Sequence, residues 1–376
     1  MASSLRIPLG RITLPALIGI ALACGLALST AVRADVPAGY PADYQSIIDA
    51  AKQEGKVVVY STTDAALVNP LVKAFEAKYP DVKVEYTDLN STELYNRFIA
   101  EMAAGAGTGD LLWSSAMDLQ VKLVADGSAL TYASPEKSNL PKWANWKDQA
   151  YGTTAEPLAI VYNKRLVPEG DVPKSHADLL KLLQTKTQEY TGKITAYDPE
   201  RSGVGFLQLT QDAAVWPQAW DLFQAFGKAQ IKLYTSVGAM LERVGSGEHL
   251  IAYNIFGSYA IARAKKDPSI GWILPNDYTL ITSRVAFISA KAKAPNAAKL
   301  FLDFLLSKEG QTILANQADL HAARDDVEGE ATSKATAALV GDKIRPVMID
   351  ESLLKNLNQM ERLKFIKKWQ AAMQGQ

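Results

Sequence analysis

Lys56-Val-Val-Val-Tyr-Ser-Thr-Thr-Asp64 is the stretch from which the rest of the chain can be interpreted. Its three valines and Tyr60 form an apolar run, which is typical of a strand buried on both faces. Apolar residues at helical spacing follow, from Leu67 to Phe75. A strand, a polar turn and a helix make the first half of a parallel β-α-β unit, in which ligands bind at the carboxyl ends of the strands. We therefore predict that the turn contributes these ligand-binding residues: Ser61, Thr62, Thr63 and Asp64.

The first 34 residues have the pattern of a secretory signal peptide. Arg6 and Arg11 precede a mostly apolar run, and Val32-Arg33-Ala34 places a small residue before the expected cut at Asp35. A membrane anchor fits less well, because Pro15 interrupts the apolar run. We expect cleavage of residues 1–34 and localisation in the periplasm.

The composition after this leader limits the classes of partner. The leader holds three of the 40 basic residues and none of the 40 acidic ones, so the exported part has a net charge of −3. This balance does not indicate binding to nucleic acid or to a membrane surface. The single cysteine, Cys24, lies in the leader, so we expect a fold without disulfides, which a chain of this length can sustain.

The order of strand and helix patterns predicts an α/β fold with two lobes, each a mainly parallel sheet flanked by helices. A second set of alternating elements begins near Thr154, and the chain returns to the first set near Leu280. We assign residues 35–153 and 281–376, with a C-terminal helix, to lobe one and residues 154–280 to lobe two. Two crossings would form a hinge, and the cleft between the lobes would collect strand ends from both.

Further strand ends supply candidate ligand-binding residues. Ser114 and Ser115 end a second buried strand in lobe one. Arg201, Ser202 and Gly203 form a strand-to-helix turn in lobe two, where free backbone N–H groups and an arginine favour an anion.

The alternative for each hydroxyl or carboxyl group at these turns is that it only caps a helix. Asp64 could be a helix cap, a contact to a ligand amine, or a source of repulsion against an anion.

The chain carries an ordered set of motifs that resembles a known family. The motifs are Val57–Asp64, Asp110–Ser115, Ile160–Lys164, Asp198–Gly203, Ser246–Glu248 and Phe301–Gln311. The set resembles the bacterial extracellular solute-binding proteins of ABC importers, and most closely the type-2 periplasmic branch that includes ferric-iron-binding proteins. The resemblance implies a monomer that captures a small molecule in the cleft, closes, and delivers it to a membrane permease with its ATPase.

One departure from that branch decides the expected ligand. Iron binders carry two adjacent tyrosines after the strand that matches residues 250–254, and this chain has Phe256 and Gly257 there, with Tyr259 nearby. Asn254 and Tyr259 flank this position and complete the set of predicted ligand-binding residues. The three histidines are not spaced as metal ligands.

We therefore predict a small anionic organic solute, a phosphate ester, phosphonate or carboxylate, bound without a metal or another cofactor. Ferric-iron transport is the alternative. A secreted hydrolase is more remote, since no Gly-x-Ser-x-Gly elbow is present and no histidine is placed beside a serine, and we expect no enzymatic activity.

Overall fold

The computed structural model describes Met1, residues 36–105 and residues 109–375. The predicted signal peptide lies, apart from Met1, outside these residues, and every element named below belongs to the unit formed by residues 35–376. No helix within the described residues has the length and apolar character needed to cross a membrane.

The first sheet is built around the predicted valine strand, β1. Its strand order is β2-β1-β3-β12-β5-β4, and β1 pairs in parallel with both of its neighbours. Val57 and Val59 are fully buried in it. The strands are β1 (Lys56–Ser61), β2 (Lys83–Asp88), β3 (Leu111–Ser114), β4 (Asn145–Trp146), β5 (Ala150–Gly152) and β12 (Val285–Ile288). The flanking helices are α1 (Gln45–Glu54), α2 (Ala65–Lys78), α3 (Ser91–Ala103), α4 (Met117–Ala125), α11 (Pro295–Leu306) and α12 (Lys308–Gln317).

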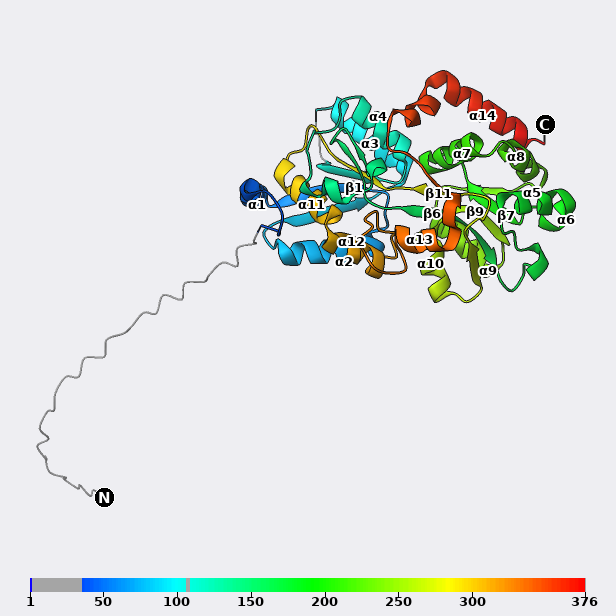
Figure 1. Cartoon of the computed structure of the whole chain (residues 1–376), viewed down its shortest axis with the longest axis horizontal. Coiled ribbons are helices and arrows are strands. Elements are labelled where there is room, and N and C mark those ends of the chain that lie inside the picture. The colour runs from blue at the N-terminus through cyan, green and yellow to red at the C-terminus, as the bar shows by residue number, and fades with distance from the viewer. Residues whose placement is uncertain (2–35, 106–108, 376) are drawn as a thin grey trace, which may run out of the picture. The chain divides into compact units, whose positions relative to one another are not determined.

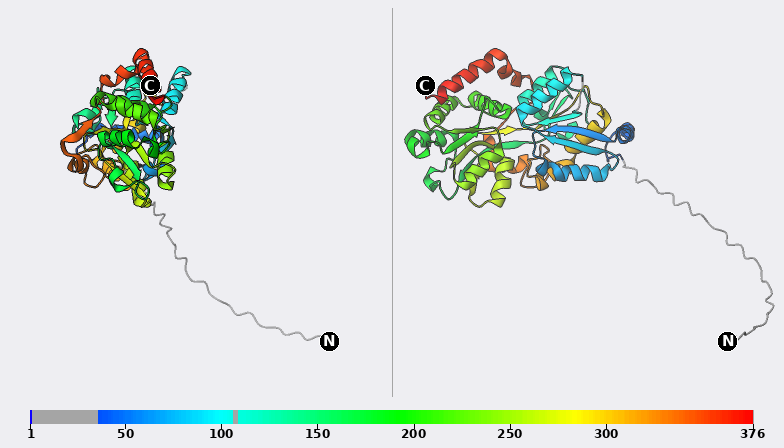
Figure 2. Two further views of the ribbon diagram at one scale, coloured as in Figure 1. Left: turned by 90° about the vertical axis from the view of Figure 1, so that its right-hand side faces the viewer. Right: turned by 180° about the vertical axis from the view of Figure 1, so that it is seen from behind.

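The second sheet has the strand order β13-β11-β6-β9-β7-β8, with β10 also paired to β6. Its strands are β6 (Glu156–Asn163), β7 (Ile194–Tyr197), β8 (Lys232–Tyr234), β9 (Ile251–Phe256), β10 (Ile270–Ile273), β11 (Thr279–Thr282) and β13 (Ile344–Pro346). The helices around it are α5 (His176–Thr185), α6 (Thr187–Tyr190), α7 (Gly203–Val215), α8 (Ala219–Lys228), α9 (Val237–Ser246) and α10 (Gly257–Lys266). Figures 1 and 2 show the two sheets in separate lobes that meet where their strands approach each other.

The prediction of a two-lobed α/β fold is confirmed, but both sheets are mixed rather than mainly parallel. Parallel pairing holds for β1 with β2 and β3, and for β7 with β8 and β9. The strands at the lobe junction are antiparallel: β5 with β12 in the first sheet and β6 with β11 in the second. The reason is that the chain leaves lobe one through residues 153–155 and returns to it through residues 283–284, and these two crossings run side by side in opposite directions.

The C-terminal segment departs from the predicted lobe assignment. We predicted that the C-terminal helix belongs to lobe one, but β13 pairs with β11 and α14 (Gln359–Met373) packs on α8 of lobe two. Trp369 of α14 is buried in the lobe-two core, 5.5 Å from Phe223 between ring centroids. The sequence indicated a long helix at the C-terminus but did not indicate which lobe it would cover.

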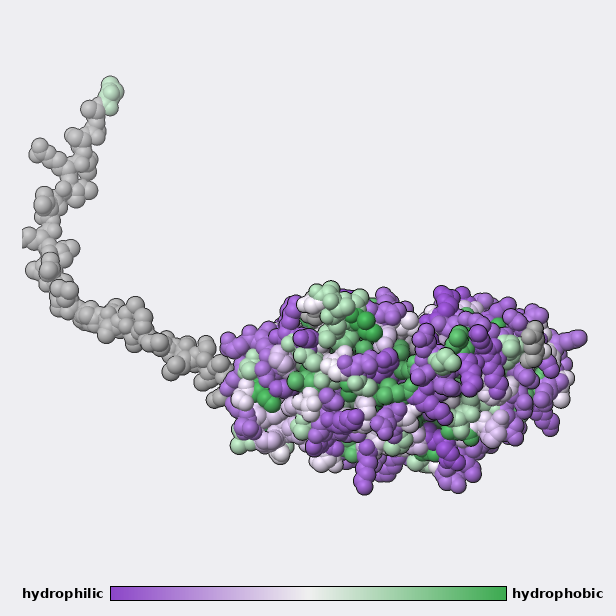
Figure 3. Space-filling model, turned by 90° about the horizontal axis from the view of Figure 1, so that it is seen from above, coloured by the Kyte–Doolittle hydropathy of each residue, from purple (hydrophilic) through white to green (hydrophobic). Residues whose placement is uncertain are grey.

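A 3₁₀ helix, Glu351–Leu357, precedes α14 and packs on α4 of lobe one. The C-terminal segment therefore contacts both lobes. Figure 3 shows the face of the molecule seen from above in Figure 1, where hydrophilic residues predominate and hydrophobic ones form small groups between them.

Candidate functional site

A cavity of about 330 Å³ lies between the two lobes, at the carboxyl ends of the parallel strands. Lobe one contributes residues after β1, β2 and β3, and lobe two contributes residues at the ends of β7, β8 and β9. The crossing segment before β12 contributes Arg284. This is the position at which ligands bind in open α/β sheets.

Three of the residues predicted in lobe one line this cavity: Thr62, Asp64 and Ser115. The Thr62 hydroxyl oxygen accepts a hydrogen bond from the Ser115 backbone N–H at 2.9 Å and lies 3.0 Å from Ser115 Oγ. These contacts join the turns after β1 and β3, so the two predicted loops do lie together.

The other three predicted residues of lobe one lie behind the lining. Ser61 Oγ accepts a hydrogen bond from the Thr63 backbone N–H at 3.1 Å, and Ser114 Oγ accepts one from Ala116 at 3.2 Å. Ser61, Thr63 and Ser114 are all buried, and none lines the cavity. Hydroxyl groups that bond to the backbone two residues ahead stabilise turns, which is the role that the structure gives Ser61 and Ser114.

Asp64 occupies the N-cap position of α2, but its side chain makes no capping hydrogen bond. Asp88, at the end of β2, takes that role, because its Oδ2 accepts a hydrogen bond from the Ala65 N–H at 3.0 Å. The Asp64 backbone N–H points to the Tyr259 hydroxyl at 3.5 Å. Desolvation raises the pKa of Asp64, while the charge of Arg284 acts in the opposite direction.

The predicted anion site at the start of α7 is not formed in this structure. Ser202 lines the cavity and caps α7, since its Oγ accepts from the Gly205 N–H at 3.2 Å. Arg201 is exposed outside the cavity. The backbone N–H of Gly203 donates instead to Thr92 Oγ1 of lobe one at 3.2 Å. A lobe-one hydroxyl therefore takes up a donor that we assigned to the solute.

The residues predicted after β9 have different positions. Tyr259 lines the cavity, whereas Asn254 does not. Asn254 has a φ of 54°, a left-handed conformation that asparagine tolerates better than most residues, and its Nδ2 donates to Asp212 at 2.6 Å. The buried Asp212 also accepts from the hydroxyls of Tyr253 and Tyr278, so Asn254 belongs to a structural network.

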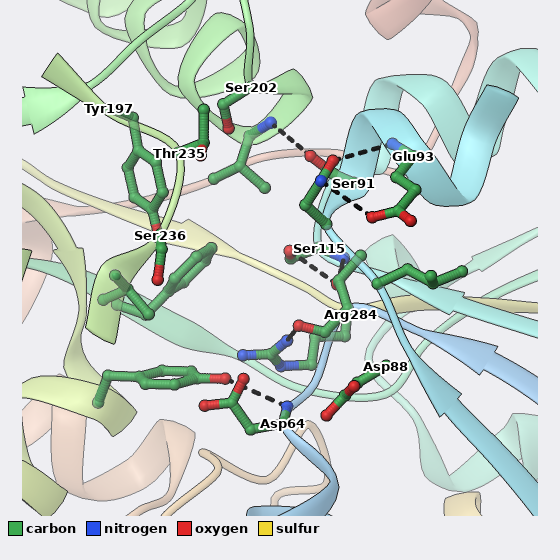
Figure 4. Close-up of a pocket in the computed structure, with 17 residues that line it drawn as sticks. Asp64, Asp88, Ser91, Glu93, Ser115, Tyr197, Ser202, Thr235, Ser236 and Arg284 are labelled. Carbon is green, nitrogen blue, oxygen red and sulfur yellow. Dashed lines mark hydrogen bonds between the residues drawn. The ribbon is translucent and has the colours of Figure 1, made fainter. Parts of the chain in front are cut away.

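Arg284 is the basic residue of the cavity, and the sequence did not predict it there. Its side chain is 1% exposed, and its Nε lies 2.8 Å from Glu156 Oε1, which is also 1% exposed. Its Nη1 donates to the Thr62 carbonyl at 3.4 Å, while Nη2 has no hydrogen-bond partner within the described residues. Figure 4 shows the guanidinium between Ser115 and Asp64.

The electrostatic surroundings keep Arg284 charged. Burial alone would lower its pKa, but the carboxylate of Glu156, together with Tyr259 and Tyr86, outweighs that effect, and the pKa is raised above its ordinary value. The guanidinium also lies over two rings, 5.5 Å from the centroid of Phe256 and 5.7 Å from that of Tyr259. A signal for Arg284 was present in the sequence, because a single arginine follows the apolar strand at the return crossing.

The position of the tyrosine pair lies in buried surroundings. Burial raises the pKa of Tyr259, although the charge of Arg284 opposes this, so the phenol is protonated at neutral pH. A Cβ atom at Gly257 would lie 2.9 Å from Pro157 Cγ and 3.1 Å from the Pro157 carbonyl oxygen. A tyrosine there would require β6 to move. Within the described residues, no group of three or more His, Cys, Asp or Glu side chains is arranged to hold a metal ion.

Helix N-termini from both lobes converge on the cavity. Five of the lining residues occupy N-cap positions: Asp64 of α2, Asn90 of α3, Ser202 of α7, Ser236 of α9 and Phe256 of α10. Each N-terminus carries a partial positive charge, and together they favour negative charge in the cavity.

Comparisons with known proteins identify relatives of this chain. Residues 70–340 match the family model described as bacterial extracellular solute-binding protein. The substrate binding protein of the ABC transporter from Agrobacterium tumefaciens is 39% identical in sequence, with a TM-score of 0.81 over 85% of this chain and 94% of that one.

Two more distant structures share the fold. AfuA from Actinobacillus pleuropneumoniae, solved with exogenous fructose-6-phosphate bound, is 21% identical, with a TM-score of 0.70 over 85% of this chain and 98% of its own. Iron-bound HitA from Pseudomonas aeruginosa is 21% identical, with a TM-score of 0.67 over 84% of this chain and 99% of its own.

Proposed function

The chain belongs to the bacterial extracellular solute-binding protein family, and on that premise we propose that it captures a small anionic solute in the interlobe cavity. It then delivers the solute to the permease and ATPase of an ABC importer. The proposed solutes are phosphate esters, phosphonates and carboxylates. The chain acts as a binding protein, exported to the periplasm after removal of residues 1–34, and performs no chemical reaction.

The observation that carries this proposal is the unpartnered Nη2 of the buried Arg284. A buried donor without a partner costs free energy, and an anionic oxygen in the cavity would complete its hydrogen bonding. The pairing with Glu156 positions the guanidinium and offsets the cost of burying its charge. The five helix N-termini add a favourable potential for the same ligand.

Hydroxyl groups provide the remaining contacts in the proposal. Ser115 and Thr62 face Arg284 from lobe one, and Ser202 and Thr235 line the cavity from lobe two. A solute bound to both sets favours the closed arrangement of the lobes, because it interacts more strongly with that state than with an open one. The fructose-6-phosphate seen with AfuA is an anion of the proposed class, and this supports the proposal by analogy of fold.

A thermal-shift screen tests the proposal against ferric iron. The chain is melted with phosphate esters, phosphonates, carboxylates and Fe³⁺, since a ligand that binds only the folded state raises the melting temperature. We expect stabilisation by at least one organic anion. Stabilisation by Fe³⁺ alone, with a visible tyrosinate charge-transfer band, would replace this function with iron transport through Tyr259.

A further inference from the structure

We propose that the solute carries a cationic nitrogen, such as a primary ammonium, a few bonds from its acidic group, and that Asp64 binds this nitrogen. The inference rests on the proposed function, because it concerns the same cavity and assumes that Arg284 binds the acidic group. It narrows the solute class from anions in general to zwitterions.

The carboxylate of Asp64 does not cap its helix, and its side-chain hydrogen-bond partner is the Tyr259 hydroxyl. Asp64 stands at the N-cap of α2 without a side-chain capping bond, and Asp88 supplies the cap instead. Glu93, another carboxylate of the cavity, accepts from Asn90 Nδ2 at 3.1 Å as part of the cap of α3. Within the described part of the chain, Asp64 forms no ion pair with lysine or arginine. The Asp64 carboxylate interacts with the neutral Tyr259 hydroxyl and with the charge of Arg284, and it retains acceptor capacity for a solute in a cavity suited to an anion.

A solute that carries only negative charge would be repelled by the Asp64 carboxylate. The charge of Arg284 is already matched by Glu156, its buried ion-pair partner. A phosphate or carboxylate placed on Arg284 Nη2 would approach the Asp64 carboxylate, and a second cation beside Arg284 would be needed to offset the repulsion between them. A ligand ammonium supplies that cation, and sugar hydroxyls would not.

Arg284, which is proposed to bind the acid, and Asp64, which is proposed to bind the nitrogen, lie side by side. Tyr259 contacts both: its hydroxyl lies 3.5 Å from the Asp64 backbone nitrogen, and its ring lies under the Arg284 guanidinium. Figure 4 shows Asp64 and Arg284 at the same end of the cavity. Tyr197 and Phe256 also line the cavity with buried aromatic rings, and ring faces attract cations. Because Tyr259 contacts both groups, a solute that binds both would carry its ammonium a few bonds from its acid.

Matched ligand pairs test the inference by calorimetric titration. Each pair differs by an ammonium against a methyl group: phosphoethanolamine and propyl phosphate, 2-aminoethylphosphonate and propylphosphonate, β-alanine and butyrate. We expect an ammonium-bearing member to bind at least about 10-fold more tightly than its partner, which is a difference of about 1.4 kcal/mol. In Asp64→Asn this advantage should disappear, while the methyl-bearing anion binds as well as before or better.

The control variant is Asp81→Asn, which removes a surface carboxylate of lobe one that is 59% exposed and lies outside the cavity. It should leave the preference for the ammonium unchanged. Melting each variant without ligand verifies that it is folded, which we expect because Asp64 makes no capping bond.

Four outcomes would overturn the inference in distinguishable ways. If the methyl-bearing anions bind as tightly as their partners, the solute is a plain anion, and if the advantage survives in Asp64→Asn, another group binds the nitrogen; in both cases the proposed function stands. If fructose 6-phosphate alone binds and weakens in Asp64→Asn, the carboxylate accepts from solute hydroxyls instead. If no acid of the series binds, the proposed function itself fails.

Discussion

Asp118 shows how burial changes the chemistry of a single carboxyl group in this protein. It lies in α4, 2% exposed, and its Oδ1 accepts a hydrogen bond from the Leu119 N–H at 2.9 Å. Burial raises its pKa to about 7, although this hydrogen bond and the charge of Arg362 oppose the rise. The folded protein therefore holds this proton more tightly than the unfolded chain, where the pKa of aspartate is about 3.9.

The consequence is a loss of stability as the pH rises. The stabilisation from protonated Asp118 is fully present below about pH 4 and is lost as the pH rises through about 7, the folded-state pKa. Asp118→Asn keeps the neutral shape at every pH, so its stability relative to the wild type should rise by about 2–3 kcal/mol between pH 5 and pH 8. Denaturant unfolding at both pH values measures this difference.

An equal effect of Asp118→Asn at pH 5 and pH 8 would contradict this account. The Asp118→Asn variant should keep part of the pH dependence even so, because burial also raises the pKa of Asp303 to about 7. Asp303 accepts hydrogen bonds from Tyr44, Tyr132 and Ser134, so it is not replaced without losing them.

At the residue level, the sequence predicted the kind of side chain near the cavity better than the individual residues that line it. Hydroxyls after parallel strands were correctly expected near the cavity, because strand order fixes where strands end. The sequence did not show which hydroxyls turn inward: Thr62 and Ser115 line the cavity, whereas Ser61 and Ser114 bond to their own turns. Arg284 was missed because its importance depends on Glu156, which is distant in sequence and reaches it only through the antiparallel crossings.

The N-termini of α3 and α7 form a contact between the lobes that should contribute to closure. Thr92 Oγ1 donates to the Arg201 carbonyl and accepts from the Gly203 N–H, both at 3.2 Å, and Ser91 Oγ accepts from the Val204 N–H at 3.3 Å. Because α7 offers its free N–H groups to lobe one, this contact replaces the anion site that we had predicted there.

Thr92→Val tests this contact, because it removes the hydroxyl while nearly keeping the shape of the side chain. If the closed state loses two hydrogen bonds of about 1 kcal/mol each, we expect the solute to bind roughly 5- to 30-fold more weakly. Without solute, the melting temperature of Thr92→Val should stay close to that of the wild type if the lobes are open. Calorimetric titration measures the affinity, and Thr312→Val on the exposed face of α12 is the matched control. Unchanged affinity in Thr92→Val would show that the contact does not contribute to closure.

The packing of α14 on α8 depends on a glycine. A Cβ atom at Gly227 would overlap the Ala372 carbonyl oxygen and lie 2.8 Å from Met373 Cα. Gly227→Ala should therefore displace α14 and destabilise the protein by about 1–3 kcal/mol, despite the better helix propensity of alanine. The control is Gly238→Ala in α9, where the nearest atom to the added Cβ is 3.7 Å away. Thermal melts should show a loss in Gly227→Ala alone; equal melting temperatures would contradict the close packing.

At the scale of the whole molecule, the alternation of strand and helix patterns predicted the two lobes and their crossings. The direction of the junction strands was not predictable from local patterns, since it follows from the chain crossing between lobes and returning. Nor was the path of the C-terminal segment, whose apolar faces could have packed on either lobe. Leu353 of this segment packs in one hydrophobic core and Trp369 packs in the other. The chain between these two residues must therefore adjust when the lobes move.

Calorimetric titration of Arg284→Lys, with Arg201→Ala as the control, tests the central claim that a buried guanidinium binds an anionic solute in the cavity. Lysine keeps the charge beside Glu156 but lacks the second nitrogen that points to the solute. The account predicts that Arg284→Lys, verified as folded by its ligand-free melt, binds the stabilising anion at least about 10-fold more weakly than the wild type. Arg201→Ala should bind it normally. Full affinity in Arg284→Lys together with lost affinity in Arg201→Ala would contradict the account and place the anion at the start of α7.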